Sequence, residues 1–341
     1  MHRLLVPTFR LASAPIMARL GLVLSCLLTG FALANLGASQ DRLERGAGAG
    51  YAVGLGERWH FNMADRPVKV VLVAGSIGAW RDHPYARLLQ ESCSNVEIRN
   101  LSVVGMGAPQ LYTRFRDEVI RGRAIPRDVP GGEAWLMWNG GLNSAGSSTR
   151  TNRSIRRAFV DAHQHGMRVV GLSLSPWGSL ADRRWRDGGA LSTLRNTRGI
   201  VDFVLGRLTP PEALGHYVAD RDVPDAPWDP SELADVRVDL YNSPLRAVDA
   251  EPRSVEAMTR LLERDHRWRR EVDALSPDER ILRIQSDVGL LSELPRWFLR
   301  DELVGFDPIH PNRAGHQIIA DAICPAVPAS WGCTCPTHSD D

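Results

Sequence analysis

The stretch VKVVLVA at residues 68–74, followed by Gly75 and Ser76, decides the fold of this chain. It is a short apolar run, rich in β-branched residues, that ends at a glycine, and this pattern is typical of a strand buried on both faces of a parallel sheet. Outward from it, strand-like and helix-like segments alternate. We predict further strands at 96–104, 134–138 and 168–174, separated by helices at 82–90, 110–121 and 151–165. Such alternation indicates an α/β domain with helices on both faces of its sheet.

The later part of the chain is less regular. Residues 236–241 and 281–285 both have the composition of a strand, and either could be the fifth strand of the sheet. Between them, residues 254–275 form a charged amphipathic stretch that predicts one helix. We therefore expect a three-layer α/β/α domain over residues 68–325, with about five parallel strands and a helical insertion near 243–280.

The first 39 residues have the layout of a secretory signal. Arg3, Arg10 and Arg19 precede an uncharged, mostly apolar run, and Ala32-Leu33-Ala34 offers the small-x-small pattern that a signal peptidase reads. We predict a signal peptide at 1–39, with an uncleaved membrane anchor as the alternative and Met17 as an alternative start. The Gly- and Ala-rich residues 40–67 are expected to be a linker. The protein is thus expected to be exported, either periplasmic or secreted, and to touch the membrane only if the N-terminal segment stays uncleaved.

The composition narrows the class of protein. The chain has 341 residues, 43% of them hydrophobic and 24% charged, which suits a globular protein with a large core. Its formal net charge of +1 argues against a dedicated nucleic-acid binder, because such proteins carry a strongly basic face.

The cysteines indicate disulfides. A cleaved signal would remove Cys26 and leave an even number, namely Cys93, Cys324, Cys333 and Cys335, in an oxidising compartment. Cys333 and Cys335 are separated by one residue, so each is expected to pair elsewhere, and Cys324 bonded to one of them would fix the C-terminal tail at 326–341. A metal site that uses His338 lacks the paired spacings of zinc modules, and we predict no metal.

Polar residues and glycines follow each predicted strand. Active sites of parallel sheets form where the strands end at their carboxyl sides. The candidates are Gly75-Ser76, Gly105-Met106-Gly107, Asn139-Gly140-Gly141-Leu142-Asn143 and Ser175-Pro176-Trp177-Gly178.

Four short blocks resemble those of the SGNH/GDSL hydrolases. They are Ser76 after the first strand, Gly105 after the second, Gly141-Leu142-Asn143 after the third, and Asp307-Pro308-Ile309-His310 near the C-terminus. The resemblance implies the family's flavodoxin-like α/β/α sheet and a serine esterase that needs no cofactor. Two positions depart from the family pattern, because Gly75 stands where an Asp usually precedes the serine and Ser144 follows Asn143 where an Asp is common.

The chemistry of these residue types agrees with that assignment. A serine hydroxyl needs an adjacent base to act as a nucleophile, and Asp307, three residues before His310, is close enough to orient the imidazole toward Ser76. The N–H groups of Ser76 and Gly105 and the side-chain amide of Asn143 are the expected oxyanion donors.

The expected substrate is a small-molecule or carbohydrate ester, such as an O-acetyl sugar, and the expected reaction is hydrolysis through an acyl-enzyme on Ser76. Two alternatives stay open: an O-acyltransferase that acts on an envelope polysaccharide, and an inactive SGNH-like domain that only binds. Arg183, Arg184 and Arg186, near Trp177 and Trp185, are either a solvated loop or a cluster that binds an anionic or carbohydrate ligand.

Overall fold

The computed structural model describes residues 61–122, 132–186, 188–215 and 226–336. The predicted signal segment at 1–39 and the predicted linker as far as residue 60 lie outside these ranges. No helix within them is long and apolar enough to cross a membrane.

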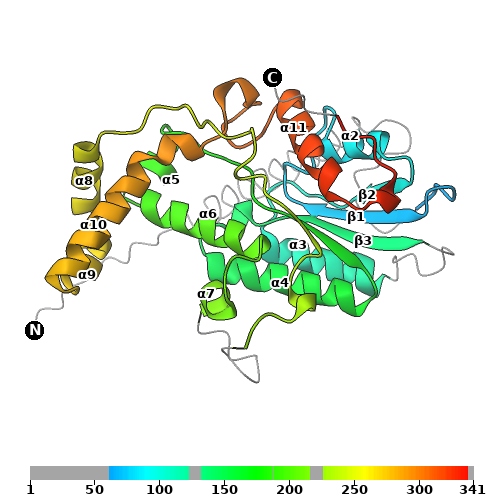
Figure 1. The fold of residues 1–341 in the computed structure, drawn as a ribbon, viewed down its shortest axis with the longest axis horizontal. Coiled ribbons are helices and arrows are strands. Elements are labelled where there is room, and N and C mark those ends of the chain that lie inside the picture. Colours follow the sequence, from blue (N-terminus) through cyan, green and yellow to red (C-terminus); the bar gives the residue numbers. More distant parts are fainter. Residues whose placement is uncertain (1–60, 123–131, 187, 216–225, 337–341) are drawn as a thin grey trace, which may run out of the picture. The chain divides into compact units, whose positions relative to one another are not determined.

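A five-stranded sheet forms the centre of the described domain (Figure 1), and its strands pair in the order β2-β1-β3-β4-β5, all parallel. This is the flavodoxin-like order, in which the chain reverses its direction of growth between β1 and β3. The predicted five-stranded parallel sheet is confirmed. The strands are β1 (Val68–Ala74), β2 (Val96–Asn100), β3 (Glu133–Asn139), β4 (Arg168–Leu172) and β5 (Val236–Val238).

Helices cover both faces of the sheet. Strand β1 is accordingly apolar on both sides. Val71 and Val73 contribute to one core cluster and Val70 and Leu72 to the other. The first cluster lies under α3, α4 and α6, and the second under α2 and α11 (Figure 1). The helices are α2 (Tyr85–Ser92), α3 (Ala108–Arg114), α4 (Ser148–Gln164), α5 (Arg183–Arg186), α6 (Ala190–Val204), α7 (Pro210–Leu214), α8 (Val255–Glu263), α9 (His266–Asp273), α10 (Pro277–Ser292) and α11 (Arg313–Ile323). A π-helical turn, η1 (Phe115–Arg121), continues α3.

The choice between the two candidate fifth strands is settled in favour of β5, and the alternative strand at 281–285 is wrong. Those residues lie inside α10. Ser276 and Glu279 form a capping box, and Pro277 occupies the first turn, so the local signals start a helix just before the apolar residues. Val288 and Leu291 of the same helix are buried, while Leu282 is 66% exposed, which shows that one helical face alone meets the domain.

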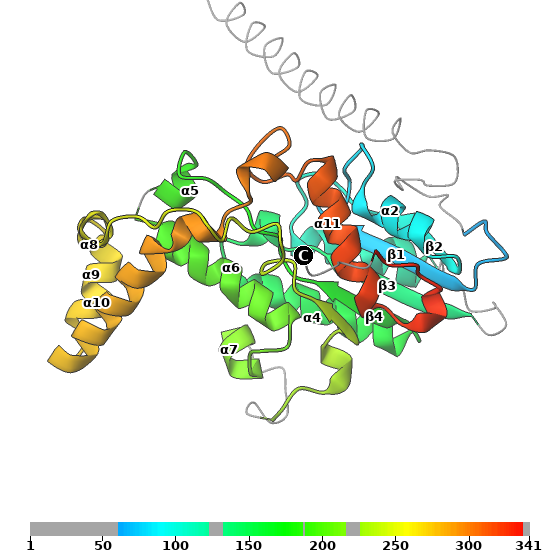
Figure 2. The same cartoon turned by 45° about the horizontal axis from the view of Figure 1, so that its top comes forward.

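The single helix predicted at 254–275 is instead two helices, α8 and α9. Asp265 divides them, because its carboxylate accepts the N–H groups of Arg267 and Trp268 and so caps a new helix. Together with α10 these helices form the insertion beside α6 (Figure 2). The buried Asp287 of α10 fixes it there, since it accepts a hydrogen bond from Trp268 Nε1 at 2.7 Å and pairs with Arg195 of α6.

The two ends of the described domain are tied to the sheet. Asn62 and Met63, from the end of the predicted linker, donate their N–H groups to the buried carboxylate of Glu97 at 2.6 and 2.9 Å. Two disulfides hold the C-terminal tail, Cys93–Cys333 and Cys324–Cys335. The expectation that Cys324 pairs with one of the two close cysteines, and that those two do not pair with each other, is confirmed.

Candidate active site

Ser76 lies just past β1, in a single helical turn. The N–H of Ala79 donates to the Gly75 carbonyl at 3.1 Å, and the buried Asn100 at the end of β2 donates to the Gly78 carbonyl at 2.7 Å. A Cβ on Gly78 would lie 2.5 Å from the Ala74 Cβ and the Ser102 Oγ. Gly78 is therefore required for close packing of this turn, which holds the serine in place.

The loop that carries Asp307 and His310 is organised around one oxygen. Asp307 Oδ1 accepts the backbone N–H groups of Ile309 and His310 at 2.8 and 3.0 Å, and it lies 2.7 Å from His310 Nδ1. On the other side of the ring, His310 Nε2 is 2.7 Å from Ser76 Oγ. The structure thus brings Ser76, His310 and Asp307 into one hydrogen-bonded chain across 234 residues of sequence separation.

Two aromatic rings stack on the imidazole of His310, a residue that is only 8% exposed. The ring of Phe306 stacks on it at a centroid distance of 4.5 Å and also stacks on Trp80 at 5.5 Å. Phe306 is 72% exposed, so the side of the imidazole that faces solvent carries an open aromatic surface. The sequence analysis did not identify Phe306 or Trp80. The only available signal was that Phe306 immediately precedes Asp307.

A second histidine lies behind this stack. His316 of α11 stacks on Trp80 at 5.4 Å and on Tyr85 at 5.9 Å, and its Nδ1 accepts the Tyr85 N–H at 3.3 Å. Burial, together with the nearby His310, lowers the pKa of His316 to about 3, and Asp82 opposes the shift. His316 is therefore a neutral packing residue at ordinary pH.

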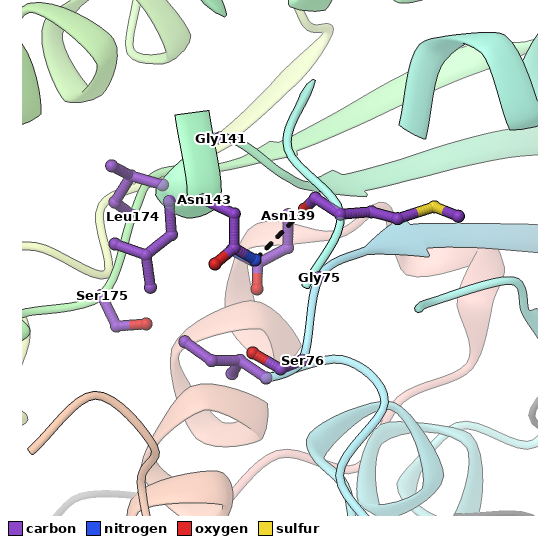
Figure 3. A pocket seen from close by; sticks show the side chains of 10 residues that line it. Gly75, Ser76, Asn139, Gly141, Asn143, Leu174 and Ser175 are labelled. Atoms are coloured by element: carbon purple, nitrogen blue, oxygen red, sulfur yellow. Dashed lines mark hydrogen bonds between the residues drawn. The ribbon is translucent and has the colours of Figure 1, made fainter. Parts of the chain in front are cut away.

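On the opposite side of Ser76, the segment after β3 carries Asn143 in the short helix η2 (Leu142–Ser144). Asn143 Nδ2 donates to the Met106 carbonyl at 3.2 Å and would lie 3.5 Å from a Cβ on Gly75 (Figure 3). A side chain at position 75 would therefore point at the Asn143 amide. The structure brings Asn143 to the serine, whereas Gly105, exposed and with a φ of +79°, is not among the residues that line the pocket.

Ser144 holds the Asn143 segment where the family pattern often has an Asp. Its hydroxyl accepts the Ala108 N–H at the start of α3 at 3.0 Å and donates to the Gly141 carbonyl at 3.0 Å. Thr151 of α4 donates to the Ser144 carbonyl at 2.7 Å. The loops after β2 and β3 are thereby fixed to each other without the carboxylate.

A small pocket of about 20 Å³ opens beside Ser76 (Figure 3). Its wall is mostly apolar on one side, and its lining residues are Gly75, Ser76, Ile77, Met106, Asn139, Gly141, Leu142, Asn143, Leu174 and Ser175. They lie at or just after the carboxyl ends of β1, β2, β3 and β4, and so the pocket sits where the strand order reverses, as expected for this topology.

The Arg and Trp cluster after β4 does not form a ligand surface of stacked tryptophans. Trp177 and Trp185 are both buried and contact each other edge to face at 4.6 Å, and Arg184 lies over the Trp177 ring and pairs with Asp182. Within the described ranges, no three His, Cys, Asp or Glu side chains are grouped so that they could hold a metal ion.

Comparison with known proteins finds similarity to solved structures alone. No family model and no curated protein matches the chain. Similar structures include a member of the lipolytic protein G-D-S-L family from Veillonella parvula (12% identity, TM-score 0.40, covering 74% of this chain and 94% of that one). A lipase/acylhydrolase from Enterococcus faecalis matches at 16% identity and TM-score 0.37, covering 75% of this chain and 92% of that one. A catalytic mutant of an acetylxylan esterase from Geobacillus stearothermophilus matches at 12% identity and TM-score 0.37, covering 78% and 96%. These neighbours are of the kind that the sequence blocks resemble.

Proposed function

We propose that this chain is a serine hydrolase that cleaves an ester or O-acyl bond through an acyl-enzyme on Ser76. The observation that carries the proposal is the continuous chain from Asp307 through His310 to Ser76, with 2.7 Å at each of its two links. Nucleophile, base and orienting carboxylate within hydrogen-bonding distance of each other are the geometric signature of this chemistry.

The mechanism follows from the partners of the two imidazole nitrogens, because Nδ1 faces Asp307 and Nε2 faces Ser76. His310 Nε2 takes the proton of the Ser76 hydroxyl while Oγ forms a bond to the acyl carbon. Asp307 stabilises the resulting imidazolium at Nδ1. Nε2–H then protonates the alcohol oxygen as the bond to the acyl carbon breaks. A water molecule repeats the sequence on the acyl-enzyme: Nε2 takes its proton, its oxygen binds the acyl carbon, and the proton returns to Ser76 Oγ as the acid leaves.

The developing oxyanion needs hydrogen-bond donors beside Ser76. We assign this role to the Ser76 N–H and to the Asn143 amide, which lines the same pocket. Each such donor contributes roughly 3–4 kcal/mol of transition-state stabilisation. The Gly105 N–H stays a candidate donor, since the next residue, Met106, lines the pocket.

The small pocket on one side of Ser76 and the open surface on its His310 side suggest a substrate with a small acyl group and a larger alcohol. The small pocket of about 20 Å³ favours a short acyl group. On the imidazole side, the exposed Phe306 offers a face for the alcohol, and a groove of about 490 Å³ begins at Pro308 and extends along Arg246 and Arg300. An exposed aromatic ring beside His310, together with the arginines of this groove, suits a carbohydrate, so an O-acyl sugar is the substrate class we favour.

Covalent labelling tests the proposal directly. A fluorophosphonate probe should add to the purified protein in a one-to-one ratio, measured by intact mass, and Ser76→Ala should abolish both the label and ester hydrolysis. Ser94→Ala, which changes an exposed serine beside the disulfide Cys93–Cys333, is the matched control and should label as the wild type does. Wild-type protein that resists the probe, or labelling that survives in Ser76→Ala, would remove Ser76 as the nucleophile. Product analysis with and without a sugar acceptor separates hydrolysis from acyl transfer.

We also propose that the protein is exported. The basis is the charged and then apolar N-terminal segment, together with two disulfides, which persist in oxidising compartments. N-terminal sequencing of the protein from its natural host should find the mature chain starting after Ala34 or within a few residues of it. An intact apolar segment in the membrane fraction would replace the signal peptide with an anchor.

A further inference from the structure

The pocket beside Ser76 is lined by a serine hydroxyl that the mechanism does not use. Ser175 follows β4, is 2% exposed and lines the pocket. Figure 3 shows its hydroxyl directed into the pocket from the Leu174 side, with Ser76 and Asn143 on the other side. Leu174 beside it is apolar, and Asn139, another polar residue of the lining, is hydrogen-bonded to the Tyr85 hydroxyl and the Ser173 carbonyl.

The Ser175 hydroxyl is also without a partner. Within the described part of the chain, its Oγ is buried and makes no hydrogen bond. Ser173, two residues earlier, shows the usual situation, because its Oγ accepts the N–H groups of Leu240 and Tyr241 at 2.9 and 3.1 Å. A buried hydroxyl that makes no hydrogen bond is unfavourable. An atom that enters the pocket can supply the missing partner.

The position of the pocket identifies which part of the substrate enters it. His310 must reach the leaving oxygen to protonate it, and His310 does not line this pocket, whereas Ser76 and Asn143 do. The acyl group, and not the alcohol, therefore faces Ser175. One water molecule needs about 10–15 Å³ of the same kind of space, so a pocket of about 20 Å³ favours an acyl substituent of one or two non-hydrogen atoms.

We infer that the acyl group is short and carries a hydrogen-bonding oxygen on the carbon next to its carbonyl, as a hydroxyacetyl group does, and that Ser175 recognises this oxygen. A methyl or ethyl substituent would leave the Ser175 hydroxyl buried and unpaired. The inference rests on the proposed acyl-enzyme chemistry and adds the identity of the acyl group to it.

A pair of isosteric esters tests the recognition. Hydroxyacetyl and propionyl esters of one alcohol have equal numbers of non-hydrogen acyl atoms and differ by a hydroxyl in place of a methyl. The quantity to measure is the ratio of their kcat/KM values, divided by the ratio of their rates with hydroxide to remove the intrinsic reactivity of the hydroxyacetyl ester. We expect a corrected ratio of about 10 or more for the wild type, because a site built to bond a hydroxyl rejects the analogue that lacks it.

The variants decide whether Ser175 is responsible. Ser175→Ala should lower the corrected ratio about tenfold, toward one, and the ratio is internal to one sample, so it does not depend on how much protein is folded. Ser173→Ala removes a fully partnered hydroxyl from the same loop and should lower the Tm while it keeps the wild-type ratio. A wild-type ratio near one, or an unchanged ratio in Ser175→Ala, overturns the inference and leaves the esterase proposal standing. Failure of the wild type to cleave either ester overturns the proposed function itself.

Discussion

At the scale of single residues, Asp307 has two roles that a substitution can separate. Its Oδ1 accepts two backbone N–H groups and also faces His310 Nδ1. An Asn at this position can place its amide oxygen where Oδ1 lies and keep all three contacts, so it removes only the negative charge. An Ala removes the charge and the acceptor together. The loop geometry and the electrostatic support of the imidazolium therefore become distinct measurements.

We expect Asp307→Asn to lower kcat roughly 10²- to 10⁴-fold, because the imidazolium in the transition state loses its counter-charge, while the Tm stays close to that of the wild type. Asp307→Ala should lose a similar amount of kcat and also lower the Tm, because two N–H groups of the loop lose their acceptor. Steady-state kinetics and thermal unfolding of both variants check this. Equal Tm values for the two variants would contradict the structural role, and near-normal kcat in Asp307→Asn would contradict the catalytic one.

Site residues that stand in a local sequence pattern could be predicted, whereas residues distinguished only by their burial or exposure in the folded domain could not. Asp307 and His310 are three positions apart, and their spacing alone indicates a shared loop. Ser76 follows a strand whose apolar run is unmistakable. Ser175 and Phe306 gain their interest only from burial and exposure in the folded domain, which no local pattern records. The role of Gly105 as an oxyanion donor stays a prediction, and its neighbour Met106 lines the pocket.

At the scale of secondary-structure elements, capping residues decided what composition could not. The apolar residues at 281–285 suit a strand by composition, yet the capping box of Ser276 and Glu279 begins a helix ahead of them. In the same way, Asp265 ends one helix and starts the next within a stretch whose amphipathic pattern is continuous. The parallel strands were easier to predict, because a segment buried on both faces is apolar throughout.

The C-terminal segment offers a prediction at this scale. The disulfide Cys93–Cys333 closes a loop of 240 residues, and Cys324–Cys335 closes one of 11. If the constraint on the unfolded chain dominates, the first contributes about 5 kcal/mol and the second about 3 kcal/mol to the free energy of unfolding. Urea unfolding of Cys93→Ala/Cys333→Ala should therefore show the larger loss, and Cys324→Ala/Cys335→Ala the smaller one. The reverse order would mean that strain or packing around the bonds outweighs loop length.

At the scale of the whole molecule, alternation of strands and helices predicts the layers but not the order of the strands. Order depends on which helices cross on which face, and that is settled by packing between distant segments. The observed order places the ends of β1 and β3 side by side, so Ser76 and Asn143 line one pocket although they are 67 positions apart in the sequence. The site is thus a consequence of the topology, and its contacts with α11 link it to the stability of the fold.

That link gives a prediction for acid stability. His316 stays neutral in the folded protein because burial lowers its pKa to about 3, whereas in the unfolded chain its pKa is near the ordinary value of about 6.5. Below that value the unfolded state binds a proton that the folded state does not. The stabilisation is complete above about pH 6.5 and is lost as the pH falls toward 3. Between pH 7 and pH 5 this residue alone should lower the free energy of unfolding by about 2 kcal/mol.

Substitution separates this contribution from the titration of other groups. His316→Phe keeps a ring between Trp80 and Tyr85 but cannot bind a proton, and His316→Gln keeps a polar group that can accept the Tyr85 N–H. Both variants lose stability at pH 7 for reasons of packing or hydrogen bonding, and those losses do not vary with pH. The drop in unfolding free energy from pH 7 to pH 5, measured in urea, should therefore be about 2 kcal/mol smaller in each variant than in the wild type. His266→Gln, at an exposed position on α9, should keep the wild-type drop. If the His316 variants keep it too, His316 takes up its proton without unfolding, and the stack beside His310 must open in acid to let it do so.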